Sequence, residues 1–202
     1  MTDQGAVIDN EGWQRLIAAR EAYTHAVSPH YDEVLHQVAH RARTERSIGK
    51  ADIGALLLWK RLRADTRWAS ALMAVADADV REATRAATAA VRDTSLSRSQ
   101  AARAGRAALA ELPGFTSGDA LASAVLTAAA PDRMAVYDRR AHTALRSLGI
   151  TLTHSPGRYS RYIDVIDRLV AHAPEPARAW TARDVDTALY YLPLLPGASS
   201  GG

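Results

Sequence analysis

The sequence predicts an all-α protein of about ten helices, on three observations. Apolar residues recur at spacings of three and four through nearly the whole chain, and no segment shows the sustained alternation of a strand. Alanine is abundant and only 6% of the residues are aromatic, which favours closely packed helices over sheets. A length of 202 residues suffices for one substantial core, or for two small lobes around a cleft.

Six helices are expected in the first half of the chain, each from an apolar face or a boundary residue. The first carries Trp13 and Leu16 on one face, and the second begins after Pro29 and is ended by Gly49. The third has an almost wholly apolar middle, which is typical of a helix buried at the centre of a bundle. Ser97 is expected to cap the sixth. The expected ranges are 10–26, 30–46, 51–62, 67–75, 78–91 and 97–111.

Four further helices are expected in the second half of the chain. The first of them starts near Ser117 or Asp119 and ends before Pro131. The next follows Asp138 and ends at Gly149, where a glycine is the usual helix terminator. The last two expected ranges are 159–172 and 181–191.

Composition and missing motifs exclude several classes of function. Cysteine is absent, so disulfides and any Cys-ligated iron–sulfur cluster are excluded. His36 and His40 share a predicted helix face, but a single pair makes a poor metal site, and we expect neither a metal nor another cofactor. No glycine-rich nucleotide-binding motif occurs. Without a run of about 18 apolar residues or a visible signal peptide, we expect a cytoplasmic protein with no membrane partner.

The basic residues are compatible with DNA binding but do not indicate it. The formal net charge is only +3, and of the 25 basic residues only Lys50 and Lys60 are lysines. Arginine makes planar, bidentate contacts with phosphate. A GC-rich genome explains the same bias equally well.

The most informative stretch covers residues 105–149. Within it, LPGFTSG (112–118) joins two predicted helices by a tight turn. The backbone N–H groups that begin the second helix, with its dipole, suit a phosphate oxygen. Gly114 and Gly118 let the main chain approach a ligand without a Cβ in the way. The candidate DNA contacts here are Gly114, Phe115, Thr116, Ser117 and Gly118.

This stretch resembles the helix-hairpin-helix DNA glycosylase superfamily, to which endonuclease III belongs. RAALAELPGF resembles the family's helix and hairpin, and ALASAVL resembles the apolar helix that follows. AVYDRRAHTALRSLG resembles its short segment with an aspartate, followed by a helix that ends in Leu-Gly. The resemblance is clearest over about 45 residues and weaker over residues 50–104.

The resemblance implies a helix-hairpin-helix glycosylase-like bundle, a single domain over residues 1–195 with two lobes around a cleft. The central lobe is expected at about 50–149, and the second lobe from 1–49 and 150–195. Residues 196–202 are expected to form a disordered tail.

Two departures from the family pattern bear on the chemistry. Thr116 stands where the family hairpin often has a second glycine, and Gly118 is a possible substitute. Bifunctional members carry a lysine early in the second helix, which forms an imine with the sugar. Gly118 and Asp119 stand there in this chain, and both of its lysines lie far upstream. The resemblance therefore implies hydrolysis by water, without lysine-dependent lyase activity.

Asp138 is the single catalytic candidate, because it corresponds to the family's aspartate. Breaking an N-glycosidic bond builds positive charge on the deoxyribose. A carboxylate beneath the sugar stabilises that charge and can orient or deprotonate the attacking water. An aspartate that only caps a helix would look identical in the sequence, and the two roles can coexist.

A base that leaves the stack needs a pocket with aromatic and polar walls. Trp59, Tyr137 and His142 are the candidates for this pocket. Lys60 and Arg61 follow Trp59 directly and are expected to contact DNA. The alternatives are that Trp59 fills the core and that His142 is an ordinary surface residue.

Arg139 and Arg140 come directly after the catalytic candidate. We expect at least one of them to neutralise a phosphate that flanks the flipped nucleotide.

The sequence thus predicts a monomeric, monofunctional DNA glycosylase that removes a damaged or modified base from double-stranded DNA and leaves an abasic site. The target base is not indicated. One hypothesis is a hypermodified base of phage DNA, and hence antiviral defence, because the aromatic–basic cluster at 59–63 differs from the small polar residues of well-known members. The alternatives are a non-enzymatic helix-hairpin-helix DNA-binding protein and a helical protein-interaction domain.

Overall fold

The computed structural model describes residues 7–195, and that range contains ten α-helices, two short 3-10 helices and no strand. The all-α class is therefore confirmed. The helices are α1 (Asn10–Ala26), α2 (Glu33–Glu45), α3 (Lys50–Trp59), α4 (Arg67–Ala74), α5 (Asp77–Arg92), α6 (Arg98–Ala108), α7 (Ala120–Ala129), α8 (Arg139–Ser147), α9 (Arg158–Ala171), η1 (Ala177–Ala179), α10 (Ala182–Tyr191) and η2 (Leu192–Leu194). The expected tail at 196–202 lies outside the described residues.

Capping residues set the helix starts that the sequence predicted. Ser97 accepts a hydrogen bond from the Gln100 backbone N–H, and the Gln100 side chain accepts one from the Ser97 N–H in return, which forms a capping box. Asp9 caps α1 through the N–H of Gly12. The helix ends are less well predicted, because α3 ends at Trp59 instead of residue 62 and α6 ends at residue 108 instead of 111. Both helices give way to irregular turns that line the candidate site described below.

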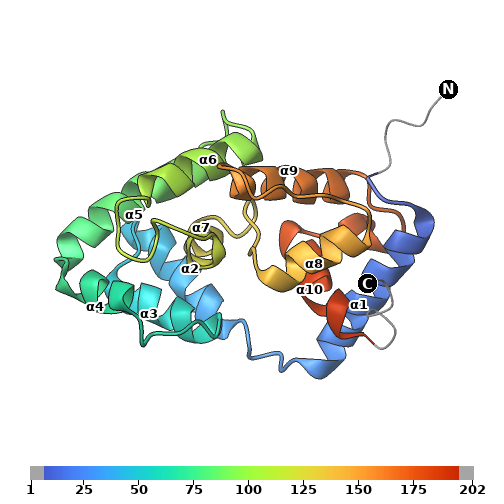
Figure 1. Cartoon of the computed structure of the whole chain (residues 1–202), viewed down its shortest axis with the longest axis horizontal. Coiled ribbons are helices and arrows are strands. Elements are labelled where there is room, and N and C mark those ends of the chain that lie inside the picture. The colour runs from blue at the N-terminus through green and yellow to red at the C-terminus, as the bar shows by residue number, and fades with distance from the viewer. Residues whose placement is uncertain (1–6, 196–202) are drawn as a thin grey trace.

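The helices form two groups (Figure 1). Helices α2 to α7 lie together on one side, whereas α1, α8 and α10 lie on the other. Helix α9 packs against α6 and against α10 and so connects the groups. Helix α2 lies against α3 and α7, although the sequence-based division at residue 49 assigned it to the second lobe. Helix α8 lies against α10, although the division at residue 149 assigned it to the central lobe.

The most enclosed helix is α7, and not α3 as its apolar middle suggested. Every residue from Leu121 to Ala129 is buried. Helix α3 instead leaves the side chain of Leu58 77% exposed, while Ile53 and Leu56 face the core. The small side chains of α7 allow the helices around it to approach closely.

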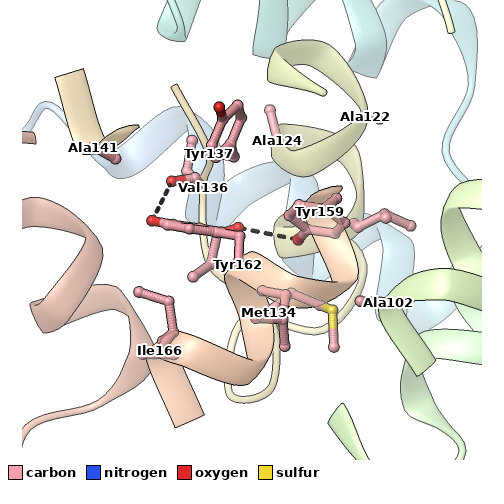
Figure 2. Close-up of a cluster of buried hydrophobic side chains, with 14 of the residues drawn as sticks. Ala102, Ala122, Ala124, Met134, Val136, Tyr137, Ala141, Tyr159, Tyr162 and Ile166 are labelled. Atoms are coloured by element: carbon pink, nitrogen blue, oxygen red, sulfur yellow. Dashed lines mark hydrogen bonds between the residues drawn. The ribbon is translucent and has the colours of Figure 1, made fainter. Parts of the chain in front are cut away.

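An extended segment, residues 134–137, leads from α7 to Asp138 and is fixed by side chains from α7 and α9 (Figure 2). The hydroxyl of Tyr159 donates to the Ala135 carbonyl and that of Tyr162 to the Val136 carbonyl, both at 3.0 Å. The Tyr137 N–H donates to Ser123 Oγ at 3.0 Å. Because buried backbone groups need partners, these bonds hold the segment in one conformation. The position of Asp138 is fixed in turn.

The lengths of the helices and the positions of the histidines bear on membrane and metal binding. Across residues 7–195, every helix is too short or too polar to cross a bilayer. His36 and His40 both lie exposed on α2, and no cluster of three or more metal-ligating side chains occurs among the described residues.

Candidate functional site

Two cavities open on either side of Asp138. The first, here called the aromatic cavity, has a volume of about 470 Å³ and lies between α1, α3, α8 and α10. Its aromatic lining residues are Tyr23, Tyr31, Trp59, Tyr190 and Tyr191. The second, here called the turn cavity, has about 480 Å³ and is lined by the α6–α7 connection, residues 109–119, and by α8 and α9. Among residues 7–195, Asp138 is the one residue that lines both cavities.

The carboxylate of Asp138 has a different partner at each oxygen. Its Oδ1 accepts a hydrogen bond from the backbone N–H of Ala141 at 2.8 Å, so Asp138 caps α8. Its Oδ2 lies 2.9 Å from Nζ of Lys60. The side chain is 17% exposed, and so it is partly withdrawn from solvent but accessible from the cavities. Capping and contact with a ligand are therefore compatible at this position.

Lys60 reaches Asp138 because α3 ends where it does. Its N–H bonds to the Leu56 carbonyl, which makes it the C-cap of α3. The next residue, Arg61, has a φ of 54° and turns the chain away. The Lys60 side chain is only 10% exposed and lines the aromatic cavity. The pair joins residues that are 78 positions apart in the sequence, and both of them line the aromatic cavity.

Cations lie over several aromatic rings at the cavity walls. The guanidinium of Arg140 lies 4.8 Å from the ring centroid of Tyr190, and that of Arg61 lies 5.5 Å from the ring of Tyr31. Trp59 is buried and donates from its indole N–H to Asp32 at 3.1 Å. Trp59 is therefore a core residue whose ring also forms part of the cavity wall. Aromatic rings and guanidinium groups of this kind can stack on a planar ring of a ligand.

A network of charged side chains, of which Asp186 is fully buried, forms what is here called the floor of the aromatic cavity. Arg183 donates to Asp186 at 2.6 Å and to Asp32 at 2.9 Å. Asp186 also accepts from the Val136 N–H at 2.7 Å, which connects the network to the segment before Asp138. Burial raises the pKa of Asp186 to about 6, although Arg183 opposes the shift. For Arg183, burial is outweighed by the two carboxylates, which raise its pKa further.

The α6–α7 connection presents its second half to the turn cavity. Gly114 has a φ of +90°, and a Cβ at this position would lie 2.3 Å from the Trp68 ring. Phe115 is fully buried, and its N–H donates to the Leu112 carbonyl at 3.0 Å. Thr116, Ser117 and Gly118 are exposed. Phe115 therefore anchors the turn in the core and does not offer its side chain or its amide to DNA, whereas the last three residues remain accessible.

Asp119 holds the turn against two neighbouring helices. Its carboxylate pairs with Arg106 at 3.2 Å and with Arg158 at 2.9 Å. The guanidinium of Arg158 also lies 5.0 Å from the ring centroid of Tyr137. Asp119, with these two partners, stands near the position where bifunctional members of the glycosylase superfamily have their lysine. Burial, the largest influence, raises the pKa of Tyr137, so its hydroxyl stays protonated at neutral pH.

The predicted base-pocket residues separate between the two cavities. Trp59 lines the aromatic cavity, whereas Tyr137 and His142 line the turn cavity. His142 is half-buried and its Nε2 lies 3.2 Å from the Leu152 carbonyl. Arg139 and Arg140 diverge in the same way, the first towards the turn cavity and the second towards the aromatic cavity. Lys60 and Arg61 both belong to the aromatic cavity.

Sequence reasoning missed most of the floor of the aromatic cavity. Asp32, Arg183 and Asp186 were not identified, and neither were the tyrosines of α1 and α10. Arg183 and Asp186 are three residues apart on one helix, which is the only local signal, because Asp32 lies 151 positions from Arg183. Tyrosines at helical spacing are ordinarily core residues and gave no warning of a cavity.

Comparisons with protein-family models, curated proteins and solved structures found no match. Membership of the glycosylase superfamily therefore stays a prediction from the local motifs.

Proposed function

We propose that this protein is a DNA glycosylase that hydrolyses the N-glycosidic bond of a modified or damaged base flipped out of double-stranded DNA. The observation that carries this proposal is the position of Asp138, the one lining residue common to the two cavities within residues 7–195. One cavity has the walls that a base needs, and the other has the groups that a phosphate chain needs.

The aromatic cavity is the proposed base site. Its volume of about 470 Å³ falls within the roughly 300–1,000 Å³ of sites for small organic molecules. A flipped base is read by stacking on aromatic rings and by hydrogen bonds to its edge. Tyr190 and Trp59 offer rings, and the buried Asp186 offers a carboxyl group. A base with a polar substituent, such as a hypermodified base of phage DNA, is the substrate we favour, because the floor carries paired charges.

The turn cavity is the proposed site for the DNA backbone. Ser117 and Gly118 are exposed there just before α7, whose N-terminus carries a partial positive charge, and the exposed Thr116 precedes them. Arg139 and Arg158 line the same cavity; Arg139 adds positive charge, whereas the charge of Arg158 is paired with that of Asp119. Contacts of this kind fix a protein on DNA and read no bases.

Asp138 would act on the sugar between these two sites. As the N-glycosidic bond breaks, its carboxylate stabilises the positive charge on the deoxyribose and orients a water molecule for attack on C1′. Lys60 must then leave the second carboxylate oxygen, since it now occupies it. Although Lys60 lies 78 positions upstream of Asp138 in the sequence, its amine is next to the carboxylate in the folded protein.

The test is base excision from defined DNA. Duplexes with damaged bases, and phage genomic DNAs with modified cytosines, are incubated with the protein and heated in alkali, which cuts at abasic sites. We expect cleavage with at least one substrate and a loss of about 100-fold or more in Asp138→Asn. Asp9→Asn is the matched control, because Asp9 also caps a helix, α1, but lines neither cavity. Absence of abasic sites across the whole panel would refute the proposal.

A second candidate is a DNA-binding protein without chemistry. The observation that favours it is that both oxygens of Asp138 already have partners, Ala141 and Lys60. In this case the wild type binds DNA without forming abasic products, and Asp138→Asn, whose amide oxygen can still cap α8, binds DNA as the wild type does.

A further inference from the structure

Lys60 brings a primary amine to the proposed catalytic carboxylate. Its Nζ lies 2.9 Å from Oδ2 of Asp138, with both side chains mostly buried at the edge of the aromatic cavity. A primary amine forms imines with aldehydes, which an arginine at the same position could not do. Because 23 of the 25 basic residues are arginines, a lysine at this point is chemically distinctive.

The main chain holds this amine in place. Lys60 closes α3 through the bond of its N–H to Leu56, and the Leu62 N–H bonds back to the Leu57 carbonyl at 3.0 Å. Arg61 adopts a left-handed conformation, with a φ of 54°, which is uncommon for a residue other than glycine. Non-glycine residues held in this region cluster at functional sites. The side chain therefore extends from a fixed turn to Asp138.

We propose that Lys60 forms an imine with C1′ of the abasic deoxyribose and that the protein then cuts the DNA strand. The proposal rests on the proposed function, because base removal supplies the abasic sugar in the same site. It assigns the amine to Lys60 at the end of α3, and not to a residue of the α6–α7 connection.

The step balances without an oxidant or a second substrate. The ammonium loses a proton to solvent, and the amine attacks the aldehyde carbon C1′ of the ring-opened sugar. Loss of water gives a protonated imine, whose C2′ proton passes to the Asp138 carboxylate. The C3′–O bond then breaks, and the phosphate leaves with the downstream strand. Water hydrolyses the imine, which restores Lys60 and leaves an unsaturated aldehyde on the upstream strand.

The chain offers a matched control, because its only other lysine lies elsewhere. Lys50 opens α3, and its Nζ donates to the carbonyls of Met73 and Val75 at 3.1 and 2.8 Å. It lines neither cavity. A covalent adduct can therefore be assigned to one of two lysines or to the N-terminal amine.

The experiment uses the full chain and a duplex with a preformed abasic site, treated with sodium borohydride to reduce any imine to a stable adduct. We expect a borohydride-dependent protein–DNA adduct in the wild type and in Lys50→Arg. In Lys60→Arg, which retains the positive charge beside Asp138, we expect the adduct to fall by at least 100-fold. Peptide mapping should locate the adduct at Lys60, and strand cleavage should be lost with it.

Two results would overturn the inference: no adduct in the wild type, or an adduct that persists in Lys60→Arg or maps to the N-terminal amine. Thermal unfolding and circular dichroism of each variant establish that it is folded. Since the abasic site is made beforehand, the outcome does not depend on excision. Adduct formation without base release for any substrate would count against the proposed function alone, and base release without an adduct would count against Lys60 alone.

Discussion

The two cavities that meet at Asp138 have similar volumes, about 470 and 480 Å³, but very different walls. The aromatic cavity is lined mostly by side chains on helices, and charges in it are paired in the Arg183 network and in the Lys60–Asp138 pair. The turn cavity is built partly from main chain, at Gly114, Ser117 and Gly118.

This difference indicates what each cavity can recognise. Fixed aromatic rings and a hydrogen-bonded floor discriminate between planar groups by shape and by edge chemistry. An exposed turn with arginines beside it binds a repeating anionic chain without regard to sequence. A protein that acts on one base in a duplex needs both properties within one nucleotide of each other, and Asp138 lies where they adjoin.

The largest effect is expected from the glycine that shapes the turn cavity. Gly114→Ala adds a Cβ that would lie 2.3 Å from the Trp68 ring, in a backbone with a φ of +90°. Left-handed strain and overpacking together should lower the free energy of unfolding by about 2–5 kcal/mol. Gly118→Ala is the control, because its φ is +75° but nothing lies within 4 Å of the added atom, and it should cost only about 1–2 kcal/mol. Urea unfolding measures both, and equal losses would contradict the role of Trp68 in holding the turn.

A smaller effect, dependent on pH, is expected from the floor of the aromatic cavity. The pKa of Asp186 rises from 3.8 to about 6 on folding, which corresponds to about 3 kcal/mol. The folded state therefore binds a proton more tightly. This carboxyl group stabilises the fold below about pH 4, and the contribution is lost as the pH rises through 6. Denaturant titrations should show this in the difference between the free energies of unfolding of Asp186→Asn and the wild type. That difference should shift in favour of the variant by up to about 3 kcal/mol between pH 4 and pH 7.

Asp184, on the same helix, provides the control of opposite sign. Burial raises its pKa, but the hydrogen bonds from Thr181 and Arg20 outweigh burial, and the net pKa is lowered. Its stabilising contribution is therefore present above the ordinary aspartate pKa and is lost as the pH falls below it. Asp184→Asn should lose stability relative to the wild type at neutral pH and approach it in acid. The same pH trend in both variants would refute the assignment of the buried charge to Asp186.

The helices could be predicted from the sequence because their signals are local. Ser97 with Gln100, and Asp138 before an amphipathic run, specify helix starts within four residues of chain. The end of α3 could not be predicted in this way. Residues 60–62 continue a helical pattern, yet the chain turns at Arg61. The guanidinium of Arg61 lies over the ring of Tyr31, and this contact with a distant segment leaves no signal in the local sequence.

Single residues of the candidate site could be named from the sequence, but the partners that they contact could not. Asp138 and the glycines of the turn could be identified, because a helix-capping carboxylate and a turn glycine have recognisable neighbours. The partner of Asp138 could not, since Lys60 is 78 positions away and meets it only in the folded chain. Phe115 was assigned to the DNA surface by its place in the motif, but the core takes its side chain.

The smallest effect, and the most direct test of the difference between the cavities, comes from two adjacent arginines. Arg139 and Arg140 are both exposed, but the first lines the turn cavity and the second lines the aromatic cavity over Tyr190. The slope of log affinity against log salt concentration is negative, and Arg139→Ala should make it less negative by about 0.9, as expected for one lost phosphate contact. Arg140→Ala removes the same charge, yet it should change the slope less and lower the rate of base release instead. Binding titrations over a range of salt concentrations distinguish the two variants. Identical slopes would mean that the DNA backbone crosses both cavities, and the assignment of one cavity to the base would then fail.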